Sequence, residues 1–302
     1  MQALRVCDTM RALLETTPYL SVHSVFTHAC NLRTIEGETL TLQTRGMSLV
    51  PHGCILPCDS LRELFRQNER VAVLSVQHLA GSSCDIRLTG TPRCDLRLKT
   101  HAPIAGLVDL ARELYRFLPR NPPAGGFHSM CRTHDSAPLP PAQTGLTAAL
   151  DSLTHWLRGE NARIISLEKT LERMVGLGVG LTPAVDDFLL GILLLLDVLC
   201  EPRRKELTKA LIPLLPRTTE VSSAMLANGC TGRYPEPLLA LFSTTPKKLS
   251  VALANVAGYG HSSGHDTLCG IAFALDGLMG MAMLDGTSAA RDERRPVFHQ
   301  TT

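Results

Sequence analysis

The sequence predicts an α+β protein, with a mostly antiparallel β domain at the N-terminus and an all-α domain at the C-terminus. Apolar residues alternate in Thr39–Thr44, and Val71–Val76 has the composition of a buried strand. Helical spacing follows Pro141. Pro119–Pro141 between them is rich in proline and glycine, as an exposed linker would be. We therefore expect a β-rich domain over residues 1–118, a linker over 119–142 and a helical domain over 143–302.

The N-terminal elements are expected in the following order. A short helix ends at Pro18, and strands separated by glycines then follow to about residue 100. Leu61–Gln67 is expected to be a helix among these strands. Cys84–Thr89 and Cys94–Lys99 resemble each other and flank a glycine turn, which predicts a hairpin. Ile104–Phe117 has helical spacing.

The helical domain is expected to follow the linker, in which His128 and His134 would be solvent-exposed. Eight segments after the linker show helical spacing with loop breaks between them. They are Thr147–Leu157, Ile164–Val175, Pro183–Leu199, Lys205–Leu215, Val221–Asn228, Pro237–Phe242, Lys247–Ala257 and Asp266–Leu284.

The composition excludes several function classes. A net charge of +2 gives no strong attraction to nucleic acid or to an anionic membrane. Aromatic residues make up only 4% of the chain, which disfavours base-stacking platforms. The charged N-terminus does not have the pattern of a signal peptide, and no apolar run is long enough for a membrane span. We expect a cytoplasmic protein that binds neither nucleic acid nor membrane.

A glycine-rich loop and a helix start form the first candidate site, Gly176–Ile192. Its alternating glycines suit a backbone with positive φ. Thr182 is expected to be the N-cap, with Pro183 at the first helical position. Asp186 and Asp187 fall in the first turn of a helix that is apolar on nearly every side. Both carboxylates are therefore expected to be buried and to need partners.

A second stretch, Gly258–Ile271, repeats this design. Asp187–Ile192 and Asp266–Ile271 share the pattern D-x-L-x-G-I, so that each Asp lies on the same helix face as the Gly four residues later. We expect the two helix starts to converge, with Asp187 and Asp266 within roughly 10 Å and both glycines at the helix contact. The alternative is that each Asp only complements its helix dipole and each Gly only allows packing.

The sequences of the two loops do not decide which ligand binds. Exposed N–H groups at a helix start attract anions, but the loop lacks the lysine of a nucleotide-binding P-loop. The acids would repel a bare phosphate. Either a divalent cation such as Mg²⁺ bridges them to it, or the substrate presents N–H donors to the acids. His261 could carry a proton, with Ser262 and Ser263 as hydroxyl donors.

These two stretches also resemble a known family. The runs G-x-G-x-G-L-T-P-x-x-D-D-x-L-x-G and G-H-S-S-G-x-D-T-L-x-G are similar to those of the AllH family, over about thirty residues. The resemblance implies a subunit of the oxamate carbamoyltransferase of anaerobic allantoin breakdown. Its partners would be an AllF subunit, similar to the FdrA proteins, and an AllG subunit. That enzyme interconverts oxalurate plus phosphate with oxamate plus carbamoyl phosphate, so a small anion such as carbamoyl phosphate or oxamate would bind.

The motifs and the resemblance together give the candidate site residues. The catalytic candidates are Asp187, His261 and Asp266. The candidates for binding substrate or phosphate are Gly178, Gly180, Thr182, Ser262, Ser263, Gly264 and Thr267. The candidate metal ligands are Asp186, Asp187 and Asp266.

Other functions stay open at this point. Val179 and Ala184 depart from the proline and the serine expected in the family, which is compatible with a paralogue acting on another carbamoyl or acyl compound. The chain could instead be a non-catalytic scaffold that binds the partner subunits. Gly264–Ala272 also distantly resembles the metal-binding helix start of ADP-ribosylglycohydrolases, which would imply a stand-alone magnesium hydrolase.

Overall fold

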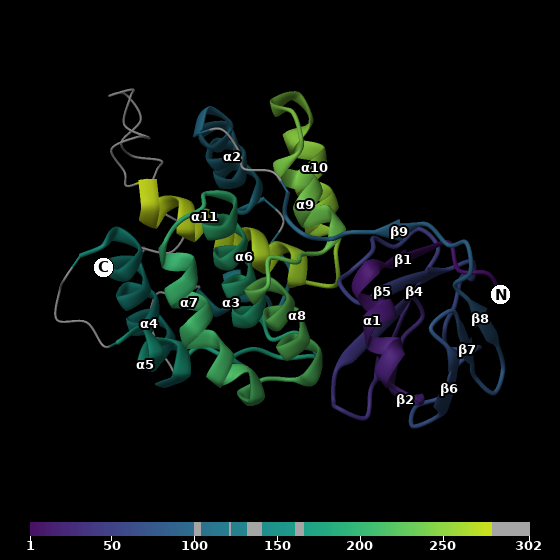
Figure 1. Cartoon of the computed structure of the whole chain (residues 1–302). Coiled ribbons are helices and arrows are strands. Elements are labelled where there is room, and N and C mark those ends of the chain that lie inside the picture. Colours follow the sequence, from purple (N-terminus) through teal and green to yellow (C-terminus); the bar gives the residue numbers. More distant parts are fainter. Residues whose placement is uncertain (100–103, 121, 132–140, 161–165, 280–302) are drawn as a thin grey trace. The chain divides into compact units, whose positions relative to one another are not determined.

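The chain divides into two compact units. The computed structural model describes residues 1–99, 104–120, 122–131, 141–160 and 166–279. We call Met1–Leu98 together with Thr231–Leu239 the β unit, and 99–230 together with 240–302 the helical unit (Figure 1). Each unit is described by itself.

Nine strands of the described chain form one sheet in the β unit. They are β1 (Arg5–Cys7), β2 (Tyr19–Val25), β3 (Ala29–Arg33), β4 (Thr39–Thr44), β5 (Gly53–Leu56), β6 (Arg70–Ser75), β7 (His78–Ala80), β8 (Asp85–Arg87) and β9 (Arg93–Cys94). The strand order is β8-β7-β6-β2-β3-β4-β5-β1-β9. β4 pairs with β5 and β1 with β9 in parallel, and the remaining pairs are antiparallel. The predicted, mostly antiparallel character of this part is confirmed.

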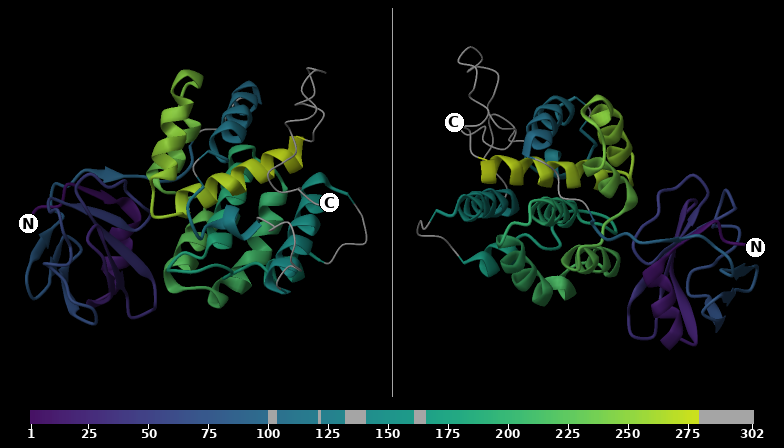
Figure 2. Two further views of the ribbon diagram at one scale, coloured as in Figure 1. Left: turned by 180° about the vertical axis from the view of Figure 1, so that it is seen from behind. Right: turned by 45° about the horizontal axis from the view of Figure 1, so that its top comes forward.

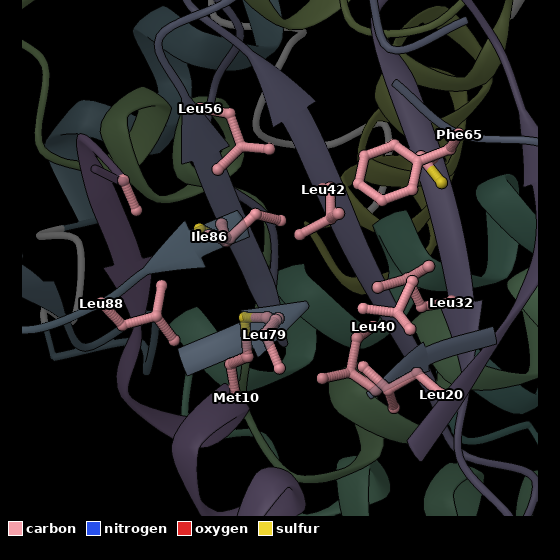
Figure 3. Packing of buried hydrophobic residues seen from close by; sticks show 14 of the residues in the cluster. Met10, Leu20, Leu32, Leu40, Leu42, Leu56, Phe65, Leu79, Ile86 and Leu88 are labelled. Atoms are coloured by element: carbon pink, nitrogen blue, oxygen red, sulfur yellow. The ribbon is translucent and has the colours of Figure 1, made fainter. Parts of the chain in front are cut away.

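The sheet curls around an apolar core. The segment before β1 bonds to the end strand β8, where the Ala3 N–H donates to the Arg87 carbonyl and the Arg87 N–H to the Met1 carbonyl, both at 2.9 Å. Helix α1 (Asp8–Thr16) contributes Met10 to the enclosed cluster. Figure 3 shows Met10 among leucines of several strands and Phe65. Burial of such side chains supplies most of the free energy that stabilises the unit.

Two N-terminal predictions were wrong. Leu61–Gln67 forms turns rather than a helix, because the buried side chains of Leu61 and Phe65 fix the segment against the core. The expected hairpin does not form either. β8 pairs with β7, and the segment after it pairs with β1, where the Val6 N–H donates to the Pro92 carbonyl at 3.1 Å.

A return segment, Thr231–Leu239, belongs to the β unit although the sequence placed it in the helical domain. Glu236 accepts hydrogen bonds from the Arg5 guanidinium (3.0 Å) and from the Leu49 N–H (3.2 Å). Tyr234 is buried, and its N–H donates to the Leu96 carbonyl at 3.1 Å. These contacts span more than 130 positions of sequence, beyond the reach of local patterns.

All elements of the helical unit in the described ranges are helices, as predicted for the part after residue 143. They are α2 (Ile104–Phe117), α3 (Phe127–Cys131), α4 (Pro141–Arg158), α5 (Leu167–Glu172), α6 (Ala184–Val198), α7 (Arg203–Leu211), η1 (Ile212–Arg217), α8 (Glu220–Cys230), the end of α9 (Glu236–Phe242), η2 (Pro246–Lys248), α10 (Leu249–Ala257) and α11 (Ser263–Met279). The end of the predicted segment Asp266–Leu284 lies outside the described residues. None of the described helices is both long and apolar enough to cross a membrane.

The boundary between the units differs from the predicted one at residue 118. α2 groups with the helices, because its buried leucines pack towards α10 and α11. The predicted linker contains α3, whose first residue Phe127 is completely buried, and His128 is half-buried rather than exposed. His134 lies outside the described residues.

α6 and α11 form the centre of the helical unit. Nearly every residue of both helices is buried. In both views of Figure 2, α11 (yellow) runs between α2 and α10 on one side and the helices from α4 to α8 on the other. A side chain at Gly191 would overlap the Thr267 carbonyl oxygen, and one at Gly270 would overlap the Phe188 carbonyl oxygen. The two glycines therefore line a reciprocal contact between the helices, as expected.

This contact predicts a large effect of one methyl group. Gly191→Ala or Gly270→Ala should lower the free energy of unfolding by about 1–3 kcal/mol, because each Cβ meets backbone that must move. Gly145→Ala in α4 is the matched control, since a Cβ there meets nothing within 4 Å. It should stabilise the chain by roughly 0.5–1 kcal/mol. Denaturant titration measures all three, and equal effects at Gly191 and Gly145 would contradict the close contact.

Candidate functional site

The glycine loop folds over the start of α6. Gly176, Gly178 and Gly180 have φ values of 83°, 125° and 94°, which confirms the predicted positive φ. A side chain at Gly178 would overlap the backbone nitrogen of Ala184. The loop tip is exposed, and no backbone hydrogen bond within the described residues uses the N–H groups of 178–180. Residues 178–180 are therefore the exposed part of the loop.

Asp186 ties this loop to the helices. Its Oδ1 accepts the Gly176 N–H at 2.8 Å, and its Oδ2 accepts the hydroxyls of Thr218 and Ser222, the latter at 2.7 Å. Both oxygens are therefore committed to the protein. The geometry favours a structural role for Asp186.

Thr182 is not the N-cap. Pro183 occupies that position, and no side chain caps the helix there. The Thr182 hydroxyl lies instead 2.7 Å from the hydroxyl of Ser263, and both hydroxyls hydrogen-bond the Asp187 carboxylate. The Thr182 hydroxyl, which was expected to cap the helix backbone, thus donates to or accepts from side chains instead.

Asp187 is buried with only part of its hydrogen-bonding capacity satisfied. The residue is 1% exposed, and its Oδ2 has no hydrogen-bond partner among the described residues. Burial and then the charge of Asp266 raise its pKa well above the ordinary value, against the opposing effect of Ser263 and Thr182.

Asp266 has the same arrangement at the start of α11. It is 0% exposed, its Oδ1 accepts the Phe127 N–H at 2.7 Å, and its Oδ2 has no partner among the described residues. Burial raises its pKa to about 6, although hydrogen bonds from Phe127 and Ser262 lower it. Each acid therefore has one oxygen held by the protein and one left over.

The structure brings these two acids together. Asp187 directly precedes Phe188, which contacts Gly270, and Asp266 directly precedes Thr267, which contacts Gly191. The charge of Asp266 also raises the pKa of Asp187, which agrees with this proximity.

The remaining candidates divide by burial. His261 is exposed and Ser262 is half-buried. Gly264 is packed so closely that a side chain would overlap the Val256 carbonyl oxygen, and the Thr267 hydroxyl donates to the Ser263 carbonyl at 2.8 Å. These last two contacts serve helix packing.

The sequence did not indicate that α3, which lies in the predicted linker, packs beside the two acids. The Phe127 ring stacks on Phe188, with centroids 4.0 Å apart and planes 13° apart. A Cβ at Gly126 would lie 2.6 Å from Asp266 Oδ1. Tyr259 was also missed: burial and then Asp187 raise the pKa of its phenol. The only sequence signal for a buried Phe127 was an aromatic residue directly after a glycine pair. The surrounding prolines favoured the interpretation as a linker instead.

The three acids do not form a metal-binding cluster. Within the described ranges, no group of three or more His, Cys, Asp or Glu side chains could hold a metal ion. Asp186 cannot join Asp187 and Asp266, because its oxygens accept three protein hydrogen bonds. The two remaining acids offer one free oxygen each, which fits a weakly held, mostly hydrated Mg²⁺ at most.

The neighbouring acids should respond oppositely to mutation. Asp186→Ala should lower the free energy of unfolding by about 1–3 kcal/mol, because three donors lose their acceptor. Asp187→Asn should leave stability unchanged or raise it, because it removes a buried, half-satisfied acid. Thermal or urea unfolding of both variants tests this. A large loss in Asp187→Asn would show that this acid holds the fold.

Asp266 should make stability depend on pH. Its folded pKa of about 6 exceeds the unfolded value of roughly 3.9, so its favourable contribution is present below about pH 4 and is lost as the pH rises through 6. The free energy of unfolding of Asp266→Asn, relative to that of the wild type, should therefore rise by roughly 2–3 kcal/mol between pH 4 and pH 7. Urea unfolding across this range measures the difference. A difference that stays constant with pH would contradict the raised pKa.

Comparison with known proteins covers both units. Residues 174–275 match the family model described as oxamate carbamoyltransferase subunit AllH, and residues 2–93 match the AllH family N-terminal domain. The first match contains both glycine loops and both acids, whereas α3 lies outside both matches. No significant match to a solved structure was found. On these two matches, the chain belongs to the AllH family.

Proposed function

We propose that this chain is a catalytic subunit of an oxamate carbamoyltransferase complex. The observation that carries the proposal is the pair Asp187 and Asp266, each buried with one unpartnered oxygen, within the part of the chain that matches the family. Such half-satisfied acids are costly for a fold and are common where a ligand or a reaction uses them.

The reaction needs two things that this arrangement can supply. A phosphate oxygen attacks the carbamoyl carbon of oxalurate, and the bond from that carbon to the oxamate nitrogen breaks. The proton of hydrogen phosphate ends on the leaving nitrogen, so that oxamate and carbamoyl phosphate form. An acid of raised pKa can relay this proton, and exposed N–H groups at 178–180 can hold anionic oxygens.

Partner subunits complete the activity in this proposal. The family is named for one subunit of the enzyme, and the partners we propose are AllF/FdrA-like and AllG-like chains. The exposed loop tip, with Val179 79% exposed, and the exposed His261 are available to a partner or a substrate. The departures at Val179 and Ala184 leave room for a related carbamoyl or acyl substrate.

A non-catalytic scaffold is the second candidate. The observation that favours it is that both acids are covered, at 1% and 0% exposure. The third function considered, a stand-alone magnesium hydrolase, loses support because no metal cluster of three or more side chains exists in the described ranges.

Reconstitution with partner subunits separates catalysis from scaffolding. Asp187→Asn should reduce the turnover of oxamate and carbamoyl phosphate by at least about 100-fold, as loss of an acid–base group typically does. The complex should still assemble, and its melting temperature should change little. Asp276→Asn is the matched control, because this acid lies farther along α11 and contacts Tyr115 at 3.4 Å rather than the site.

Full turnover of an assembled Asp187→Asn complex would favour the scaffold. Activity in the wild type and in Asp276→Asn, together with its loss in Asp187→Asn, supports the catalytic subunit.

A further inference from the structure

The two acids are matched acceptors. Thr182 and Ser263 satisfy part of the Asp187 carboxylate, and Phe127 and Ser262 satisfy part of the Asp266 carboxylate. In both acids Oδ2 is the atom without a partner in the described part of the chain. An unpaired buried acceptor costs about 1–3 kcal/mol, and more if it is charged. A ligand that reaches both atoms removes this cost twice.

The chemistry of the pair favours hydrogen-bond donors over a cation. A tightly held cation needs more oxygen ligands than two, and the nearby hydroxyls of Thr182 and Ser263 already bond each other and Asp187. Asp186 is committed elsewhere. A bare anion would be repelled. A neutral group with two N–H donors satisfies both oxygens without a further ligand.

We propose that the Oδ2 atoms of Asp187 and Asp266 together bind the NH₂ group of a primary amide, one oxygen to each N–H. This rests on the proposed function, in which that amide belongs to a carbamoyl group or to oxamate. Two hydrogen bonds of about 2.9 Å diverging at roughly 120° need oxygens about 5 Å apart. A methyl group of the same size cannot make these bonds.

Phe127 is a positioning residue for this site. Its N–H holds Asp266 Oδ1 at 2.7 Å, so that Oδ2 is the oxygen left to face a ligand. Its ring stacks on Phe188, next to Asp187, and so α3 contacts both acid-bearing helices. Gly126 lets the backbone pass beside the carboxylate, where a Cβ would lie 2.6 Å from Oδ1.

Asp266→Asn gives a directional test. The Phe127 N–H requires an acceptor at the Oδ1 position, and therefore the new NH₂ group must take the place of Oδ2. A donor would then face the donors of the ligand. The probes are oxamate and pyruvate, which have the same charge and shape but differ by NH₂ against CH₃. Binding is measured by calorimetry on the full chain and on the reconstituted complex.

The wild type should bind oxamate at least about tenfold more tightly than pyruvate, which corresponds to roughly 1.4 kcal/mol. Asp266→Asn should lose this preference while pyruvate binding stays within about threefold, because a methyl group makes no bond to either acid. Asp276→Asn should keep the wild-type preference. Gly126→Ala should weaken oxamate binding when it is made in the wild type. It should cause no further loss of oxamate affinity when it is made in Asp266→Asn.

The inference would be overturned by equal binding of oxamate and pyruvate by the wild type, by an unchanged preference in Asp266→Asn, or by the absence of oxamate binding to chain and complex. Mg²⁺ alone bound by the wild type and lost in Asp187→Asn would also overturn it, in favour of a cation site. If the complex is active and its preference for oxamate over pyruvate is the same in the wild type and in Asp266→Asn, the inference is refuted but the proposed function is not. If Asp266→Asn loses the preference for oxamate but the complex transfers no carbamoyl group, the proposed function is refuted and the inference is not.

Discussion

The contact of α6 with α11 at two glycines determines the rest of the helical unit. Gly191 lies against the Thr267 carbonyl and Gly270 against the Phe188 carbonyl, so the helices approach at the level of the backbone. The contact is reciprocal, because each glycine meets the residue that directly follows the acid of the other helix. Any larger residue would separate the helices, since the overlapping atoms are backbone and not flexible side-chain ends. This spacing is the reason why two acids from distant parts of the sequence share one buried region.

Close packing also explains why adjacent acids have different roles. Asp186 and Asp187 are consecutive, but they leave the helix start in different directions. Asp186 accepts three hydrogen bonds and closes the glycine loop, so both of its oxygens are satisfied. Asp187 is hydrogen-bonded by two hydroxyls and is subject to the charge of Asp266, which raises its pKa. The free energy lost at Asp187 and Asp266 must be offset by the apolar burial of the two helices around them.

Local patterns predicted the helical unit well. The segments expected after Pro141 each overlap an observed helix in the described residues, and Ile104–Phe117 matches α2 in both bounds. The shared pattern D-x-L-x-G-I also predicted the helix contact. These features depend on periodicity and on small residues, which a single sequence displays directly.

What the sequence could not show depends on long-range contacts. The pairing of Arg93–Cys94 with β1, the return segment around Glu236 and the approach of Phe127 to Asp266 each join positions far apart in the chain. The N-cap role predicted for Thr182 was wrong for a related reason: helix-capping rules describe the backbone nearby, whereas its hydroxyl partner Ser263 comes from another helix. Composition likewise suggested a linker where one aromatic residue is completely buried.

The central claim is that Asp187 and Asp266 form one interacting pair, and a double-mutant cycle measures this directly. Unfolding free energies of the wild type, Asp187→Asn, Asp266→Asn and the double variant, all at one pH near 7, give the coupling between the two acids. Acids that interact in one buried region should show a coupling of at least about 1 kcal/mol, so that the second substitution has a different effect from the first. Effects that add to within about 0.5 kcal/mol would show that the two acids act independently, and the shared site would then have to be abandoned.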